Sequence, residues 1–254
     1  MAGLSLRRRC EFALDRALVG ARWKRLLANH IGELAAESVM ARLWRDYAVR
    51  LATLPRTGHA GADVVQRWTM LSIALYRALL ARGQRPDVAR TLLRHLAWDG
   101  YRVLGAVAWM LAWRPGRERF VRTQEAMRHV RQLFLAPPAF GWRELPAQAG
   151  RTGFDCVQCP IAQRFAAEGL SDVAVHSICS LDRRLSASWG MRLVRTQTLA
   201  DGGTLCDFRW YANDRVVHRG TTPRKALARA TNRAPGRQAA GNGVCASSRG
   251  VETR

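Results

Sequence analysis

Apolar residues recur at helical spacing through most of the first 140 residues. From Glu11 to Leu54 they fall three or four positions apart and Gly32 interrupts the run, which predicts two successive helices. Similar stripes predict three more helices, over residues 63–83, 86–110 and 115–134. Pro137-Pro138 should end the last of them, because proline lacks the backbone N–H that a helix interior needs.

The tryptophan, methionine and leucine side chains on these stripes are interpreted as core rather than as the lining of a pocket. His30, His95 and His129 lie on the same helices without ligand-type neighbours, so we interpret them as surface or hydrogen-bonded histidines. The helical half is therefore predicted to be scaffold.

Beyond Gly141 the apolar runs become shorter and the turn signals more frequent. Cys159-Pro160 and Gly169 bracket one short helix, and Ser171-Asp172 is a good cap for the next. Asp201-Gly202-Gly203 is typical of a hairpin turn. The predicted helices are residues 161–168 and 173–188, and the predicted strands are residues 152–157, 191–199, 204–212 and 216–218.

These elements predict an α+β fold, with a mostly helical N-terminal half packed with a small antiparallel sheet or hairpin region. Residues 1–140 are the predicted helical scaffold, and residues 141–220 the catalytic or ligand-binding α+β region of the same domain. Residues 221–254 contain almost no bulky apolar side chains, so they are predicted to be a disordered basic tail.

The formal net charge of +22 raises the question of a nucleic-acid or membrane partner. The excess is almost all arginine, and it is spread along the helices without a dense cluster, which favours a solvated surface over nucleic-acid binding. The most apolar run, Val103 to Trp113, is about half the ~20 residues that a membrane span needs. Charges recur from Arg7 onward, so we expect no secretory signal but a cytoplasmic protein with reduced thiols.

Four of the six cysteines lie between Gly153 and Tyr211, at Cys156, Cys159, Cys179 and Cys206. The Cys-x2-Cys pair is a common half of a zinc site, but single cysteines in place of a second pair are unusual. The competing interpretation is that some of them, Cys156 above all, are small buried apolar residues.

Carboxylates accompany the last two cysteines. Asp182 follows Cys179 by one helical turn, and Asp207 follows Cys206 directly, which would place it on the other face of a strand. His176 lies one turn before Cys179, where it is either a ligand or base or, more commonly, a surface histidine.

Three segments, CPIAQRFAAEGL, SICSLD and TQTLADGGTLCDFRW, resemble the conserved blocks of the L-2-amino-thiazoline-4-carboxylic acid hydrolase family in order and spacing. The resemblance covers about residues 154–211 and implies a layout similar to that of 4-vinyl reductase-type small-molecule domains. Cys156 and His176 lie outside the family's pattern. The characteristic family residues fall on Cys159, Cys179, Asp182, Cys206 and Asp207.

The resemblance implies a hydrolase that opens the ring of 2-aminothiazoline-4-carboxylate to give N-carbamoyl-cysteine, or that acts on a related cyclic amidine. Such a reaction needs an activated water or a thiolate nucleophile, a proton donor for the leaving sulfur, and a cation for the substrate carboxylate. The alternative is a non-catalytic module of the same fold that binds a small molecule or a metal.

Two schemes remain open for the five family residues. Cys159, Cys179 and Cys206 could converge on one divalent ion such as zinc with an open fourth position, or Cys179 could attack the carbon directly. Asp182 is expected to transfer the proton in either scheme. Arg209 or Arg195 is expected to bind the substrate carboxylate. A small-molecule substrate is the expected partner, with a homo-oligomer left open.

Overall fold

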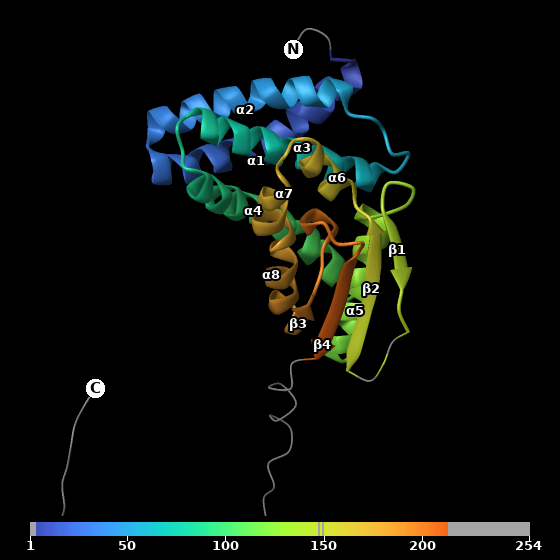
Figure 1. The fold of residues 1–254 in the computed structure, drawn as a ribbon. Coiled ribbons are helices and arrows are strands. Elements are labelled where there is room, and N and C mark those ends of the chain that lie inside the picture. The colour runs from blue at the N-terminus through green and yellow to red at the C-terminus, as the bar shows by residue number, and fades with distance from the viewer. Residues whose placement is uncertain (1–3, 147, 149, 213–254) are drawn as a thin grey trace, which may run out of the picture. The chain divides into compact units, whose positions relative to one another are not determined.

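A computed structural model of the chain describes residues 4–146, 148 and 150–212. In Figure 1, α1, α2 and α3 lie against one another at one end of this part, and α5 lies behind the sheet. The long helices are α1 (Leu6–Ile31), α2 (Glu33–Thr53), α3 (Ala60–Ala81), α4 (Pro86–Leu111) and α5 (Arg119–Phe134).

Local sequence explains where these helices begin and end. α1 starts earlier than the predicted Glu11, because the Ser5 hydroxyl accepts a hydrogen bond from the backbone N–H of Arg8 at 3.4 Å and caps the helix. Gly32 separates α1 from α2 as predicted, with a φ of 83° that side chains disfavour. Pro86 occupies the first turn of α4, where its missing N–H costs no hydrogen bond.

The C-terminal elements form one four-stranded antiparallel sheet, in the order β1-β2-β4-β3, with short helices between its strands. This arrangement confirms the predicted α+β fold class. The elements are β1 (Gly141–Glu144), β2 (Arg151–Gln158), α6 (Pro160–Ala167), α7 (Ser171–Val173), the π-helix η1 (Ala174–Cys179), α8 (Leu181–Ser188), β3 (Met191–Val194), the 3-10 helix η2 (Leu199–Asp201) and β4 (Cys206–Ala212).

The β3–β4 connection differs from the predicted tight hairpin. β3 ends at Val194 rather than at Leu199, because the Asp207 carboxylate accepts hydrogen bonds from the N–H groups of Thr196 and Gln197, both at 2.9 Å. The segment after β3 is thereby held away from the ladder. Gly202, with a φ of 80°, closes η2 rather than a two-residue turn.

Other parts of the sequence interpretation need correction or remain open. Strand β1 was not predicted, and the predicted helix 173–188 contains the π-helical turn η1. The predicted strand 216–218 and tail 221–254 lie outside the described residues. The division of the chain at residues 140 and 220 stays a prediction.

The strand register decides which side chains face the helices. Phe154 pairs with Phe208, and Cys156 pairs with Cys206, on one face of the sheet. Asp155, which pairs with Asp207, alternates to the other face. The aromatic face packs on α4, α5 and α8, with Phe154 and Phe208 stacked at 4.9 Å between ring centroids.

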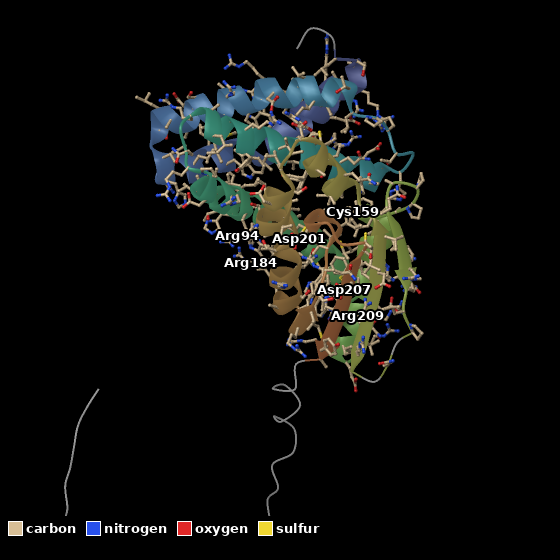
Figure 2. All side chains as sticks on the ribbon, viewed as in Figure 1. Arg94, Cys159, Arg184, Asp201, Asp207 and Arg209 are labelled. Carbon is tan, nitrogen blue, oxygen red and sulfur yellow. The ribbon has the colours of Figure 1, made fainter. Side chains whose placement is uncertain are left out.

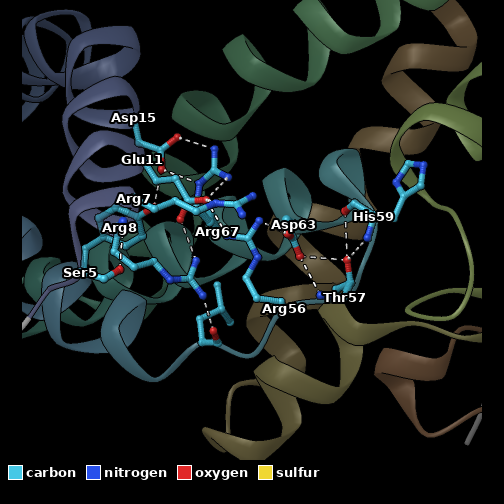
Figure 3. Close-up of polar contacts among 12 residues, drawn as sticks. Ser5, Arg7, Arg8, Glu11, Asp15, Arg56, Thr57, His59, Asp63 and Arg67 are labelled. Atoms are coloured by element: carbon cyan, nitrogen blue, oxygen red, sulfur yellow. Dashed lines mark hydrogen bonds and ion pairs between the residues drawn. The ribbon is translucent and has the colours of Figure 1, made fainter.

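A second core joins α1, α2, α3, the first part of α4, and α6. Beside it, contacts of the buried Asp15 link the first three helices, and Figure 3 shows Asp15 of α1 with Arg67 of α3. The Asp15 carboxylate accepts hydrogen bonds from the Tyr47 hydroxyl at 2.5 Å and from the Arg67 guanidinium at 3.0 Å. None of the helices in the described part of the chain combines the length and apolarity that a membrane crossing requires.

Candidate active site

A cavity of about 140 Å³ lies where the two cores meet. Its walls come from α1, α3, α4, α5 and α8 and from the aromatic face of the sheet, and they include Trp68, Leu104, Phe154 and Phe208. Among the described residues that line it, Asp182 is the only charged one. The lining of the cavity is therefore mostly apolar and carries a single carboxylate.

Asp182 is held by side chains from two other parts of the chain. It lies in the first turn of α8 and accepts a hydrogen bond from the Tyr101 hydroxyl of α4. Arg195, just beyond β3, contacts the other carboxylate oxygen at 2.7 Å through Nη1. Nη2 of Arg195 donates to the main-chain oxygen of Cys179 at 2.9 Å, which ties η1 to the same cluster.

Burial controls the acidity of this cluster. It raises the pKa of Asp182 above its ordinary value, and the opposing effects of the Arg195 charge and the Tyr101 hydrogen bond do not cancel the shift. Burial, and then the Asp182 charge, raise the pKa of Tyr101 well above its usual range. The pKa of Asp182 is thus shifted upward, in the direction of neutral pH, which suits a carboxyl group that transfers protons.

Two glycines in α4 bring the neighbouring helices close to Tyr101. A Cβ at Gly100 would lie 1.7 Å from the Trp68 ring, and one at Gly105 would lie 2.3 Å from Leu185. Tyr101 was absent from the predicted site residues. The signal that could have identified it is this pair of glycines inside a helical pattern, which indicates close packing around the residues between them.

None of the three family cysteines lines the cavity. Cys159 is the N-cap of α6, Cys179 ends η1 and Cys206 begins β4. Cys159 and Cys206 lie near enough to Cys179 to make small contributions to its raised pKa. The larger causes of that raised pKa are burial and the Asp182 charge.

The other two thiols also favour their neutral form. Burial raises the pKa of Cys206 to about 11, although its sulfur accepts a hydrogen bond from the N–H of Leu199 at 3.2 Å. A hydrogen bond with Cys156, and then burial, raise the pKa of Cys159 well above its ordinary value. All three are therefore thiols rather than thiolates at neutral pH.

The donor arrangement does not fit the predicted metal centre. Within residues 4–146, 148 and 150–212, no group of three or more His, Cys, Asp or Glu side chains is arranged to hold a metal ion. His176 is exposed, with Nδ1 2.8 Å from the Asp172 oxygen. This geometry does not support the predicted zinc site.

Asp207 and Arg209 make contacts within the sheet region instead of reaching the cavity (Figure 2). Burial opposes ionisation of Asp207, but hydrogen bonds from Thr196 and Gln197 outweigh it and lower its pKa. Arg209 pairs with Asp155 at 2.6 Å and donates to two main-chain oxygens of the sheet. Their predicted roles in catalysis and substrate binding stay predictions.

Comparison with known families identifies one match. The family model described as L-2-amino-thiazoline-4-carboxylic acid hydrolase matches residues 66–210, which is more than half of the 254-residue chain. The matched span includes Tyr101, Cys179, Asp182 and Arg195. No curated protein and no solved structure matches the chain.

Proposed function

The chain belongs to the L-2-amino-thiazoline-4-carboxylic acid hydrolase family, and from this premise we propose that it is a hydrolase that opens a 2-aminothiazoline ring or a related cyclic amidine. The observation that carries the proposal is the half-buried Asp182, held by Tyr101 and Arg195 at the wall of a ring-sized cavity. A positioned carboxyl group with a raised pKa is what proton transfer in such a reaction requires.

In the proposed reaction, the oxygen of a water molecule bonds to the ring carbon that lies between nitrogen and sulfur. The carbon–sulfur bond then breaks and the carbon becomes a urea carbonyl, as in N-carbamoyl-cysteine. One water proton ends on the ring nitrogen and the other on the departing sulfur. Asp182 accepts a proton from the attacking water and returns one to the sulfur, while Tyr101 and Arg195 hold the carboxylate in place.

The environment of Cys179 favours this water route over direct attack by sulfur. Burial and the neighbouring Asp182 raise the pKa of the Cys179 thiol, so little thiolate exists at neutral pH. Its main-chain oxygen, not its sulfur, contacts Arg195. We therefore assign the principal chemical role to Asp182.

Incubation of the purified protein with 2-aminothiazoline-4-carboxylate, with new free thiol measured over time, tests the proposal. The Asp182→Asn variant should lose about 10²- to 10⁴-fold in kcat/KM, the range for a general acid–base group. Asp172→Asn is a matched control, because Asp172 forms an exposed ion pair with Arg90.

The Cys179→Ala variant separates the two chemical routes in the same assay. It keeps the main-chain oxygen that binds Arg195, so on the water route it should retain activity within about tenfold, well short of the loss expected for a group in the proton transfer. A loss as large as that of Asp182→Asn would assign the attack to sulfur. Failure of the wild-type protein to release thiol would overturn the hydrolase proposal for this substrate.

One observation favours the second candidate, a non-catalytic small-molecule-binding module. Apart from the Asp182 region, the cavity wall is predominantly apolar, so it offers few further groups that could take part in a reaction. Stoichiometric ligand binding without thiol release would support this function.

A further inference from the structure

The cavity wall contains a hydrogen-bond donor that the protein itself does not use. Trp23 of α1 lines the cavity and is 4% exposed. Its indole Nε1 is buried and finds no acceptor among the described residues. Because a buried donor without an acceptor is unfavourable, this group in a cavity wall indicates a ligand that supplies the acceptor.

The hydroxyl groups of the same wall are already hydrogen-bonded to the protein. Thr69 and Ser72 donate to main-chain oxygens one turn earlier in α3, at 2.9 and 2.8 Å. Ser186 donates to the main-chain oxygen of Asp182 at 2.7 Å and accepts from the Trp210 indole at 2.8 Å. These groups do not require a polar ligand, so they differ from Trp23.

A buried arginine places a positive charge against the aromatic part of the wall. The Arg131 guanidinium of α5 is 4.8 Å from the centroid of the Phe154 ring, which lines the cavity. Its carboxylate partner, Glu144, has a side chain that is 62% exposed, and burial lowers the pKa of Arg131 despite this partner. The Nε atom of Arg131 has no acceptor in the part of the chain that the structure describes. The charge is therefore only partly compensated, which favours an anionic group in the cavity.

Arg195 adds a smaller contribution of the same sign. Its guanidinium is 5.1 Å from the centroid of the Phe208 ring of the wall, and its Nε likewise has no acceptor within the described ranges. The charge of Arg195 is balanced by the ion pair with Asp182, so we assign the larger effect to Arg131.

The size of the cavity limits the ligand to one ring. Its volume of about 140 Å³ is close to that of an engineered apolar cavity of ~150 Å³ that binds benzene. A single ring with one carboxylate is therefore the largest ligand that we expect it to enclose.

From these features we propose that Trp23 binds the carboxylate of the substrate, with its indole N–H donating to a carboxylate oxygen while the Arg131 charge offsets part of the cost of burying the anion. The proposal rests on the proposed function, since it names a specificity-determining residue of the same site. It differs from the predicted contact of the carboxylate with Arg209 or Arg195. Trp23 also lies outside the matched residues 66–210, in a helix that the family model does not cover.

Two aromatic analogues of the substrate test carboxylate recognition by binding alone. 2-Aminothiazole-4-carboxylate and 4-methyl-2-aminothiazole share the ring and the amino group and differ only in the carboxylate, and their aromatic ring resists hydrolytic opening. In calorimetric titrations of the full wild-type chain, the acid should bind at least about tenfold more tightly than the methyl compound, as expected for a hydrogen bond to a charged group. Equal or weaker binding of the acid would overturn the proposal.

The Trp23→Phe variant assigns this preference to the indole N–H, because it keeps an aromatic ring and removes the donor. It should bind the acid at least about tenfold more weakly and bind the methyl compound within about threefold of wild type. Trp44→Phe is the matched control, since Trp44 packs in the same helical core but does not line the cavity. If Trp23→Phe does not fold, Trp23→Leu takes its place. Unchanged binding of the acid, or an equal loss for both compounds, would overturn the assignment to Trp23.

A second pair of variants tests the charge behind Phe154. Arg131→Gln should weaken binding of the acid at least about threefold and leave the methyl compound unchanged, because a unit charge near a buried anion acts on the anion alone. Arg128→Gln, at a half-exposed position of the same helix, should change neither. Equal effects of the two substitutions on binding of the acid would overturn the role of Arg131.

Because these readouts are binding rather than turnover, the two proposals fail separately. Binding of the acid analogue that depends on Trp23, in a protein that releases no thiol from 2-aminothiazoline-4-carboxylate, would remove the hydrolase function alone. Thiol release by wild type, together with unchanged binding of the acid analogue by Trp23→Phe, would remove the Trp23 assignment alone.

Discussion

Tyr101 is one of the groups that set how readily Asp182 loses its proton, after burial and the Arg195 charge. The tyrosine hydroxyl donates to the carboxylate, and this hydrogen bond lowers the pKa of Asp182 against the larger effect of burial. Tyr101→Phe should therefore raise the pKa of Asp182 further. Since a general base must be ionised to act, the acidic limb of the pH profile of kcat/KM should move to higher pH in this variant.

The measurement is thiol release across the pH range for wild type, Tyr101→Phe and Tyr211→Phe. Tyr211 lies in β4 beside Arg151 and Arg192 and is the matched control, because it does not line the cavity. An acidic limb that stays in place or moves to lower pH in Tyr101→Phe would show that Asp182 is not the base.

At this scale the sequence identified part of the cluster. Asp182 was predicted to transfer protons, and Arg195 was predicted, as an alternative to Arg209, to bind the substrate carboxylate. The structure pairs Arg195 with Asp182, and the predicted binding role stays a prediction. Tyr101 lies 81 positions from Asp182, and only the packing of α4 on α8 brings the two together. Which of the many arginines reaches that carboxylate likewise depends on the path of the chain after β3.

At the scale of elements, the helices were predictable because burial of one face imposes a regular apolar period. The end of β3 was not, because Asp207, beyond the turn, binds the backbone N–H groups of Thr196 and Gln197. Apolar alternation along the strand carries no information about such a bond. The π-helical turn at residues 174–179 was missed for a similar reason, since a helical pattern does not distinguish one widened turn.

The network that joins α1, α2 and α3 should contribute strongly to stability. Asp15 is 1% exposed and accepts from both Tyr47 and Arg67. Asp15→Ala should lower the free energy of unfolding by about 3–5 kcal/mol, because it leaves the Arg67 charge buried without its partner. Tyr47→Phe should cost only about 1–3 kcal/mol, the range for one lost buried hydrogen bond.

Urea denaturation of both variants measures these differences. Asp87→Asn is the control, since the exposed pair of Arg85 and Asp87 should contribute no more than about 1 kcal/mol. An Asp15→Ala variant as stable as this control would show that the network does not stabilise the helical half.

At the scale of the whole molecule, the net charge of +22 reflects an excess of basic side chains, nearly all arginine, over carboxylates. Carboxylates of the described part pair with arginines from other elements, as in Arg22 with Asp99 at 2.6 Å and Arg50 with Glu168 at 2.5 Å. Some carboxylates accept from more than one arginine, as Asp155 does from Arg143 and Arg209. Protonation of the carboxylates would therefore leave a larger and less compensated positive charge.

Hydrogen bonds and arginine charges outweigh burial at a set of carboxylates and lower their pKa values. These are Glu11, Asp63, Glu125, Asp155, Glu168 and Asp207. A carboxylate with a lowered folded-state pKa stabilises the fold above its ordinary pKa, and this contribution is lost as the pH falls through the folded value. Asp182 acts in the opposite direction, because its raised pKa means that acid relieves the cost of burying its charge.

The carboxylates named above with a lowered pKa outnumber Asp182, whose pKa is raised. The free energy of unfolding should therefore fall as the pH drops below the ordinary pKa values of 4.5 for Glu and 3.8 for Asp. Urea midpoints measured from pH 6 to pH 3 check this expectation. Asp207→Asn should flatten the dependence, Asp182→Asn should steepen it, and Asp201→Asn, on an exposed residue of the same connection, should leave it unchanged. A midpoint that is constant or rises toward pH 3 would mean that the arginine contacts do not hold these carboxylates in their charged form.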